Sequence, residues 1–329
     1  MRLRKDSARP SDSVPVRATL VLALFAGSCW LSPATAGDLA FVTSQNGNMV
    51  SIIDLSDNEI ITQTALQDAP APIAYDPQAG RAYVIAADTG RLSVIDEAGR
   101  ITATRDLGEG AFGIATAPNG GLFVTDWFEA GLTRLGRDLK TLWRTDTGNA
   151  PAGVAVSAAG DLVATADRDD DAVSIFDATT GRLLRKIATA GAHPFAVTFH
   201  DDRLWTADVQ GDTVSVIDPI AGKLIGQVPT GSHPYGVAFA GGRGFVTNQY
   251  AGTLTVFDPK TLAVQAEIDI GDYPEGIAAL PDDSGVVVAN WDSDTVEVVD
   301  AQSLTVRARI DVPAGPRAFG AFTGRQVPH

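Results

Sequence analysis

The sequence predicts an all-β fold built from one repeated unit of about 40 residues, and three observations support this prediction. First, an apolar strand of four residues recurs seven times, at 41–44, 82–85, 122–125, 162–165, 204–207, 244–247 and 286–289. Second, a strand that ends in aspartate recurs at Asp54, Asp96, Asp177, Asp218, Asp258 and Asp300, spaced by 42, 81, 41, 40 and 42 residues. The interval of 81 spans two periods, with Gly136 at the missing position. Third, no segment has the periodicity of a helix longer than a turn or two.

Each repeat contains four short segments rich in Val, Ile, Thr and aromatic residues, bounded by Gly, Asn, Asp or Pro. This pattern is typical of antiparallel strands joined by tight turns. One four-stranded unit cannot bury both of its faces, so neighbouring units must stack. The sequence shows no polar caps of a linear stack, which favours radial stacking. It therefore predicts a seven-bladed β-propeller of four-stranded antiparallel blades.

The phase of the repeat predicts how the ring closes. The chain after residue 36 begins with the second strand of a unit and ends with a lone element over 316–322. That element matches the strand that opens each other unit. We expect this C-terminal strand to pair beside the first strand and close the ring, because closure removes sheet edges that would otherwise aggregate.

The first 36 residues differ from the rest and predict a signal peptide. Five basic residues are followed by an apolar run over 18–31 and then by Ala34-Thr35-Ala36, which is the order of a secretory signal. The run is too short to cross the hydrocarbon core of about 30 Å as a helix. We therefore expect a signal peptide over 1–36, a propeller over 37–329, a periplasmic or secreted location, and no transmembrane anchor after cleavage. Lipid modification of Cys29, which follows Ala26-Gly27-Ser28, is the alternative.

Charge and cysteine usage narrow the range of partners and cofactors. The whole chain has a net charge of −15, and the part after residue 36 keeps 20 Lys and Arg against 38 Asp and Glu. Such an acidic surface repels phosphate backbones, so we expect no nucleic-acid partner. Cys29 is the only cysteine, and without a Cys-x-x-Cys-His motif a covalent c-type haem is excluded. We expect a monomer.

Three segments carry a resemblance to a known family. Phe245-Val246-Thr247-Asn248, the strand 255–258 and the segment 234–239 resemble the YVTN-family β-propeller repeat, and the likeness covers about 38–322. The resemblance implies a propeller fold but does not select one function. Related propellers include surface-layer and periplasmic binding proteins, propellers that accompany quinone-dependent oxidation, dehydrogenase heavy subunits and lactonases. The third unit, with Leu135-Gly136, and the acidic turn 167–171 depart from the pattern.

The position before the repeated proline predicts a binding site at the channel mouth. Across the seven units it is occupied by Ala69, Gly110, Ala150, His193, His233, Tyr273 and Gly315. Because Ala or Gly satisfies the fold there, the two imidazoles and the phenol are surplus to the architecture. We expect this end of the ring to bind a ligand. The other candidate binding residues, from the following strand and the companion turn, are Phe195, Tyr235, Glu275, Arg317, Asp126, Trp127, Asp167, Asp208, Asn248, Asn290 and Trp291.

Metal binding at this site stays open but is not expected. His193 and His233 could supply two ligands, with Asp167 or Asp208 as a third, but two histidines without a spaced third ligand are a weak pattern. The turn 167–171 lacks the Gly and distant Glu of a calcium-binding EF-hand loop. Glu275 and Arg317 are interpreted as an ion pair in the channel rather than as an acid catalyst. The identity of any cofactor remains unknown.

The leading functional hypothesis is a binding or scaffold protein without chemistry of its own, which recognises a small molecule or a periplasmic protein at the channel mouth. The absence of G-x-S-x-G, H-E-x-x-H and P-loop motifs favours it over an enzyme. The alternative is an accessory or heavy subunit of a periplasmic oxidoreductase, in a quinone- or metal-dependent dehydrogenase system. A lactonase-type hydrolase is a third hypothesis, which would need a metal or a histidine base at the channel mouth.

Overall fold

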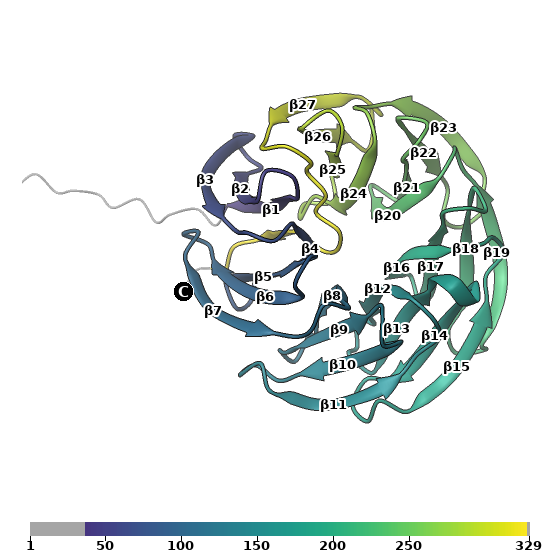
Figure 1. The fold of residues 1–329 in the computed structure, drawn as a ribbon. Coiled ribbons are helices and arrows are strands. Elements are labelled where there is room, and N and C mark those ends of the chain that lie inside the picture. Colours follow the sequence, from purple (N-terminus) through teal and green to yellow (C-terminus); the bar gives the residue numbers. More distant parts are fainter. Residues whose placement is uncertain (1–36, 328–329) are drawn as a thin grey trace, which may run out of the picture. The chain divides into compact units, whose positions relative to one another are not determined.

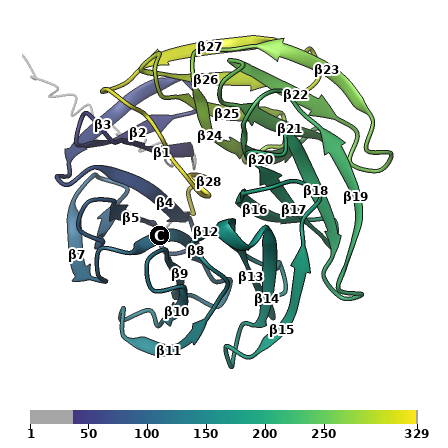
Figure 2. The ribbon, with the colours of Figure 1, turned by 45° about the vertical axis from the view of Figure 1, so that its right-hand side comes forward.

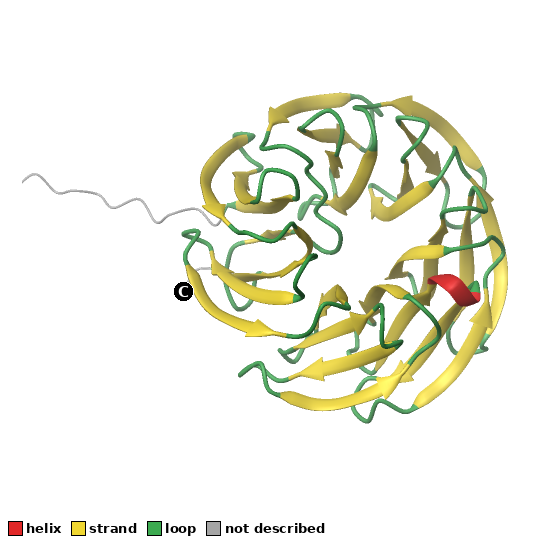
Figure 3. Ribbon diagram, viewed as in Figure 1, coloured by secondary structure: helices red, strands yellow, loops and turns green. Residues whose placement is uncertain are grey.

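The computed structural model describes residues 37–327, which form a ring of seven four-stranded antiparallel sheets (Figure 1). The single helical element of these residues is a short 3-10 turn, η1 (Arg168–Asp170), visible as the one red segment in Figure 3. The predicted seven-bladed propeller is therefore confirmed. The expected signal segment, 1–36, lies outside the described residues. Among those residues, no helix has the length and apolar character needed to cross a membrane.

The strands fall into four concentric classes, and each blade contributes one strand to each class. The inner strands are β4 (Pro70–Asp76), β8 (Ala111–Thr116), β12 (Pro151–Val156), β16 (Pro194–His200), β20 (Pro234–Ala240), β24 (Pro274–Ala279) and β28 (Thr323–Arg325). The second strands are β1 (Asp38–Ser44), β5 (Arg81–Ala86), β9 (Leu122–Asp126), β13 (Leu162–Asp167), β17 (Arg203–Asp208), β21 (Arg243–Asn248) and β25 (Gly285–Asn290). The third strands are β2 (Met49–Asp54), β6 (Arg91–Asp96), β10 (Gly131–Leu135), β14 (Ala172–Asp177), β18 (Thr213–Asp218), β22 (Thr253–Phe257) and β26 (Thr295–Asp300). The outer strands are β3 (Glu59–Ala65), β7 (Ile101–Asp106), β11 (Thr141–Asp146), β15 (Leu183–Ala188), β19 (Lys223–Pro229), β23 (Val264–Asp269) and β27 (Val306–Asp311).

We number the blades from the N-terminus. Blade 1 consists of β28, β1, β2 and β3, and blades 2 to 7 follow as consecutive groups of four strands from β4 to β27. Second and third strands lie between two neighbouring blades, so both of their faces are buried and their sequences are almost continuously apolar. The second strand β25 is buried at every residue, whereas the outer strand β27 is mostly exposed. The core therefore lies between the blades, as where Trp205 packs on Phe257 with ring centroids 5.5 Å apart.

The Gly and Thr positions of the repeat connect neighbouring inner strands. A Cβ on Gly153 would lie 2.6 Å from the carbonyl oxygen of Phe195 in the next blade, so only glycine permits this approach. The hydroxyl of Thr247 accepts a hydrogen bond from the Gly236 amide and donates one to the Glu275 carbonyl of the next blade, both at 2.9 Å. These repeated residues hold the ring together.

The ring closes through the C-terminus, but the closing strand differs in detail from the prediction. β28 pairs antiparallel with β1, and the two lie together in Figure 2. The preceding residues 316–322, which we name the strap, follow β1 only at their two ends. Between these ends the strap crosses to β4, where the Ile73 amide donates to the Phe319 carbonyl at 2.9 Å and the Tyr75 amide to Ala321 at 2.7 Å. Gly320, at φ +129°, permits this departure from strand geometry.

The two ends of the ring are distinguished by the direction of the inner strands. We name the end at which these strands begin the proline face. Its loops are 45–48, 66–69, 87–90, 107–110, 127–130, 147–150, 168–171, 189–193, 209–212, 230–233, 249–252, 270–273, 291–294 and 312–315. The loops of the opposite face are 55–58, 77–80, 97–100, 117–121, 136–140, 157–161, 178–182, 201–202, 219–222, 241–242, 258–263, 280–284 and 301–305.

Candidate functional site

The loops of the proline face differ sharply in composition from those of the opposite face. Their aromatic and histidine residues are Trp127, Phe128, His193, His233, Tyr250, Tyr273 and Trp291. The loops of the opposite face, within residues 37–327, contain no aromatic residue and no histidine. Both sets of loops perform the same architectural task of reversing the chain between strands. Turn formation therefore does not explain the aromatic side chains of the proline face.

His193, His233 and Tyr273 all have left-handed backbone conformations, with φ of +57° at each residue. This conformation costs a residue with a Cβ about 1 kcal/mol, a cost that glycine avoids. The conformation is fixed by the neighbouring blade, because the His193 amide donates to Asp171 Oδ1 at 2.7 Å and the His233 amide donates to Asp212 Oδ1 at 2.9 Å. The large side chains are thus carried by a backbone that does not require them.

Four side chains form a continuous row across blades 6 and 7, which we name the aromatic row: His233, Tyr250, Tyr273 and Trp291. His233 stacks on Tyr250 with ring centroids 3.7 Å apart, and Tyr250 to Tyr273 and Tyr273 to Trp291 are each 5.5 Å. Tyr250 is 59% exposed. Sequence reasoning did not single out Tyr250, although an aromatic residue in a turn two positions after Asn248 is a visible signal.

His193 lies outside this row, on blade 5. Its Nδ1 atom is buried and has no hydrogen-bond partner among the described residues, whereas Nδ1 of His233 lies 3.0 Å from the Ser232 hydroxyl. The two histidines are on the same face and on adjacent blades, as expected, but they share no partner. Within residues 37–327, no group of three or more His, Cys, Asp or Glu residues is arranged to hold a metal ion.

Four of the predicted binding residues point into their own blades: Asp167, Asp208, Asn248 and Asn290, all fully buried. The Ser215 hydroxyl donates to Asp208 Oδ2 at 2.6 Å, and Asn248 Nδ2 donates to the Thr255 hydroxyl at 2.9 Å. These side chains connect the end of each second strand to the third strand. Burial raises the pKa of the Asp167 and Asp208 carboxyls from about 3.8 to about 6, against the opposing effect of their hydroxyl donors.

The channel is closed beneath the proline face by an aromatic plug, formed by Phe112, Phe195, Tyr235 and Phe319. Phe195 lies 4.5 Å from Tyr235 and 5.0 Å from Phe319, measured between ring centroids. Phe112 lies 5.8 Å from Phe195 and 5.5 Å from Phe319. Three of these rings come from inner strands, and the fourth comes from the strap that closes the ring. The two sequence-predicted members, Phe195 and Tyr235, are therefore core residues of the channel.

The predicted ion pair between Glu275 and Arg317 is present beside this plug. Arg317 Nε lies 2.7 Å from Glu275 Oε2, and Arg317 Nη2 donates to the Tyr235 hydroxyl at 2.8 Å. Gln249 donates to Glu275 Oε1 at 2.6 Å, and Gln45 accepts from Arg317 Nη1 at 2.9 Å. Burial raises the pKa of Glu275, although Arg317 opposes this effect. The network anchors the strap to blades 1, 6 and 7.

On blade 3, Asp126 and Trp127 complete the predicted set. Asp126 Oδ1 accepts hydrogen bonds from the backbone amides of Phe128 and Glu129, and Arg144 lies 3.3 Å from Asp126 Oδ2. Trp127 contacts the plug through Phe112, with ring centroids 5.4 Å apart. The Arg168 guanidinium of blade 4 lies 5.6 Å from the centroid of the Trp127 ring. Asp126 thus shapes its turn, while Trp127 joins the plug to the proline face.

The acidic turn 167–171, considered above for calcium, is occupied by protein contacts. Asp170 accepts hydrogen bonds from Asn149 and forms an ion pair with Lys186 at 2.5 Å. Asp171 holds the His193 amide, as described above. The carboxylates of this turn connect blade 4 to its own outer strand and to blade 5.

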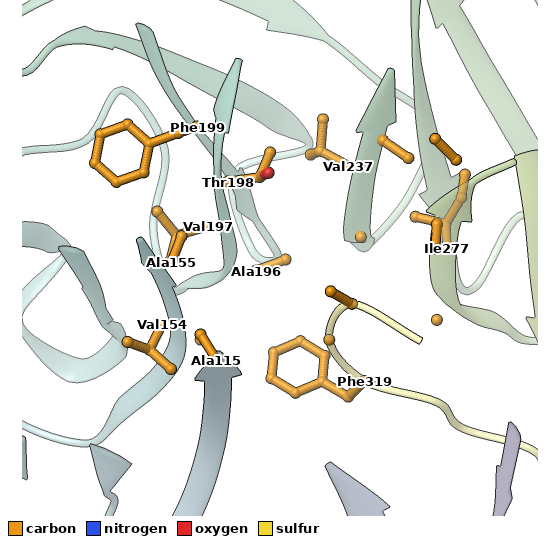
Figure 4. Close-up of a pocket in the computed structure, with 18 of the residues that line it drawn as sticks. Ala115, Val154, Ala155, Ala196, Val197, Thr198, Phe199, Val237, Ile277 and Phe319 are labelled. Atoms are coloured by element: carbon orange, nitrogen blue, oxygen red, sulfur yellow. The ribbon is translucent and has the colours of Figure 1, made fainter. Parts of the chain in front are cut away.

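A cavity of about 420 Å³ occupies the channel on the other side of the plug (Figure 4). Val154, Val197, Val237 and Ile277 line it, and Phe319 forms part of its wall. The cavity reaches His200 and other residues at the ends of the inner strands. None of the residues of the aromatic row borders it. The plug therefore separates the channel cavity from the proline face.

Comparisons with known proteins identify the fold. No family model matches the chain, and no curated protein matches it either. A protein of unknown function from Desulfotomaculum acetoxidans is 16% identical over 88% of this chain and 99% of its own, with a TM-score of 0.73. Hydrazine synthase from Kuenenia stuttgartiensis is 16% identical over 76% of this chain and 88% of its own, with a TM-score of 0.67. The dihydro-heme d1 dehydrogenase NirN is 16% identical over 84% of this chain and 74% of its own, with a TM-score of 0.63. At this identity the similarity establishes a shared propeller fold.

Proposed function

We propose that this protein is a periplasmic or secreted binding or scaffold propeller that recognises its partner or ligand through the proline face. The observation that carries the proposal is that, within residues 37–327, aromatic and histidine loop residues occur only on that face. Exposed aromatic side chains in loops on a rigid ring are a common basis of recognition. His193, His233 and Tyr273 add to this argument, because their left-handed backbone would be less costly with glycine.

The sequence features support the same proposal. The segments around Phe245 and Val256 resemble YVTN repeats, and related propellers include periplasmic binding proteins. The order of charged, apolar and small residues over 1–36 supports export. The Thr and Gly contacts between inner strands supply a rigid support for the loops.

Site-specific crosslinking tests the proposal. A photo-crosslinking amino acid is placed at Tyr250, which is 59% exposed on the proline face, or at Ile220, which is 72% exposed on the opposite face. Illumination of cells that express each variant should give a discrete adduct from position 250 and none from position 220. Adducts from both positions, or from position 220 alone, would contradict recognition by the proline face.

An accessory role in a periplasmic oxidoreductase is the second candidate. The structural similarity to hydrazine synthase and to dihydro-heme d1 dehydrogenase favours it. In this role the propeller would support a quinone or metal centre held by a partner. An absorption spectrum and metal analysis of the protein purified with its crosslinked adduct test it: a chromophore or metal in the adduct supports this role, and a colourless, metal-free adduct argues against it.

A further inference from the structure

Tyr250 is the exposed member of the aromatic row, and His233, Tyr273 and Trp291 are half-buried beside it. Neither the channel cavity nor the smaller one of about 170 Å³ beside Arg105 and Arg144 is bordered by a residue of the row. Small-molecule sites are concave and bury most of their ligand. A row of rings that borders neither cavity and that carries an exposed Tyr250 instead fits a macromolecular partner, which covers such a surface and excludes water from it.

The charge of the proline face indicates which class of macromolecule it can bind. Its loops contain eleven carboxylates, Asp68, Asp88, Glu109, Glu129, Asp169, Asp170, Asp171, Asp212, Asp272, Asp292 and Asp294, and one basic residue, Arg168. The loops of the opposite face contain nine carboxylates, Asp57, Glu97, Asp138, Asp161, Asp201, Asp202, Asp258, Asp282 and Asp283, and five basic residues, Arg100, Arg137, Lys140, Arg182 and Lys260. The proline face is thus strongly acidic, and it repels nucleic acids and anionic membranes.

Two of these carboxylates flank the aromatic row directly. Asp272 precedes Tyr273 and Asp292 follows Trp291, and both aspartates are exposed. Among residues 37–327, neither carboxylate has a hydrogen bond or an ion pair. Asp258 on the opposite face, by contrast, accepts hydrogen bonds from the amides of Lys260 and Thr261. The carboxylates beside the row are therefore available to a partner.

We propose, building on the function proposed above, that the partner is a basic protein segment whose arginine and lysine side chains stack on the aromatic row and pair with Asp272 and Asp292. Within residues 37–327, three arginines lie over aromatic rings, and two of these, Arg168 and Arg317, are also paired with a carboxylate. The Arg168 guanidinium lies 5.6 Å from the Trp127 ring centroid, and that of Arg317 lies 5.7 Å from the Tyr235 centroid. Cations over aromatic faces beside carboxylates gain from both the ring quadrupole and the charge.

Binding of a defined peptide tests this inference. The probe is a fluorescent twelve-residue peptide of alternating arginine and serine, measured by anisotropy against the full protein at low salt, with a glutamate–serine peptide as the control. We expect the arginine peptide alone to bind, and its affinity to fall steeply as salt is raised. Tyr250→Ala, and separately Asp272→Asn combined with Asp292→Asn, should each weaken binding by about five-fold.

A matched pair on the opposite face separates a specific site from diffuse attraction. Asp57→Asn combined with Asp202→Asn makes the same change in charge at two exposed carboxylates and should weaken binding by less than about two-fold. Thermal melts confirm that each variant is folded. Equal losses from both pairs, or no effect of Tyr250→Ala, would overturn the inference. If the arginine peptide does not bind while position 250 still gives its adduct, the basic partner is wrong and recognition by the proline face stands.

Discussion

The two faces of the ring use the same residue type in opposite ways. On the opposite face, Asp177, Asp258 and Asp300 each end or follow a third strand and accept backbone amides of their own turn, which lowers the pKa of these carboxyls. At the proline face, Asp167 and Asp208 are buried in the blade, and burial raises the pKa of both to about 6. The pKa values of Asp167 and Asp208 therefore shift in the opposite direction from those of Asp177, Asp258 and Asp300, because burial outweighs hydrogen bonding only for the first two.

The comparison also separates recognition from architecture. Loops of the opposite face are short, polar and held by carboxylate caps, so their composition is explained by the turns they form. Loops of the proline face carry His193, His233 and Tyr273 on a left-handed backbone. Among residues 37–327, the exposed carboxylates of Asp272 and Asp292 in these loops have no hydrogen bond or ion pair. The seven blades serve as controls for one another, because a residue type that differs between equivalent positions is not required by the fold.

The largest effect expected from a single substitution concerns the ion pair beneath the proline face. Arg317→Ala should destabilise the protein by about 3–4 kcal/mol at pH 7, because Glu275 would remain buried without its partner. Urea denaturation measures the change. Arg325→Ala serves as the control, because it removes the ion pair between the exposed Arg325 in β28 and Asp38 in β1. The expected loss of stability is below about 1 kcal/mol. Equal losses from the two variants would contradict the assignment of the buried network as the anchor of the strap.

A second prediction concerns the buried carboxyls of blades 4 and 5. Asp167 and Asp208 titrate near 3.8 when unfolded and near 6 when folded, so the folded state holds more protons between these values. Stability therefore falls as pH rises through this window, by about 3 kcal/mol for each carboxyl. Asp167→Asn with Asp208→Asn should remove this fall, since Asn248 and Asn290 fill the same position in blades 6 and 7. Denaturation at pH 4 and pH 7.5 measures the difference.

The opposite face supplies the matched control for that pH dependence. The lowered pKa of Asp258 means that its contribution is present above the ordinary value near 3.8 and is lost as pH falls through the folded value. Asp258→Asn should therefore lower stability at pH 7.5 and have less effect at low pH, the reverse of the double variant. A parallel pH dependence for the two sets of variants would show that the faces do not differ in this way.

The smallest expected effect is at the binding surface itself. His193→Ala should change the free energy of unfolding by less than about 0.5 kcal/mol, because Ala69 and Ala150 occupy the equivalent left-handed position in blades 2 and 4. Thermal unfolding checks this expectation. A loss above about 2 kcal/mol would mean that the imidazole is part of the core and would weaken the assignment of His193 to recognition.

Individual residues show how far sequence reasoning reached into the site. Ala or Gly occupies four of the seven equivalent positions, including the left-handed Ala150, so the surplus character of His193 was visible without coordinates. The ion pair of Glu275 and Arg317 was predictable from their equivalent positions on neighbouring blades. The orientation of Asp208 was not predictable, because a polar residue at the end of a second strand can point outward or into the blade. Only its hydrogen bond with Ser215 shows that it points inward.

Tyr250 and Phe319 were harder to predict because their roles depend on contacts between distant parts of the chain. Tyr250 stacks on His233 of its own blade, and the next blade extends the row by placing the Tyr273 ring centroid 5.5 Å from that of Tyr250. Phe319 fills the channel only because the strap leaves β1 and crosses to β4. A repeat alignment assigns both residues to ordinary positions, a turn and an inner strand, and contains no information about this crossing.

The sequence alone determined the number of blades, the order of their strands and the end of the ring at which unusual side chains gather, because a period of about 40 residues with alternating strands and turns admits one closed solution. Only the tertiary structure decided which of those side chains are exposed, since that depends on how neighbouring blades pack at angles that local patterns do not record. It showed that four polar residues point into the blades, that an aromatic plug lies across the channel, and that a row of rings with an exposed Tyr250 lies beside exposed carboxylates.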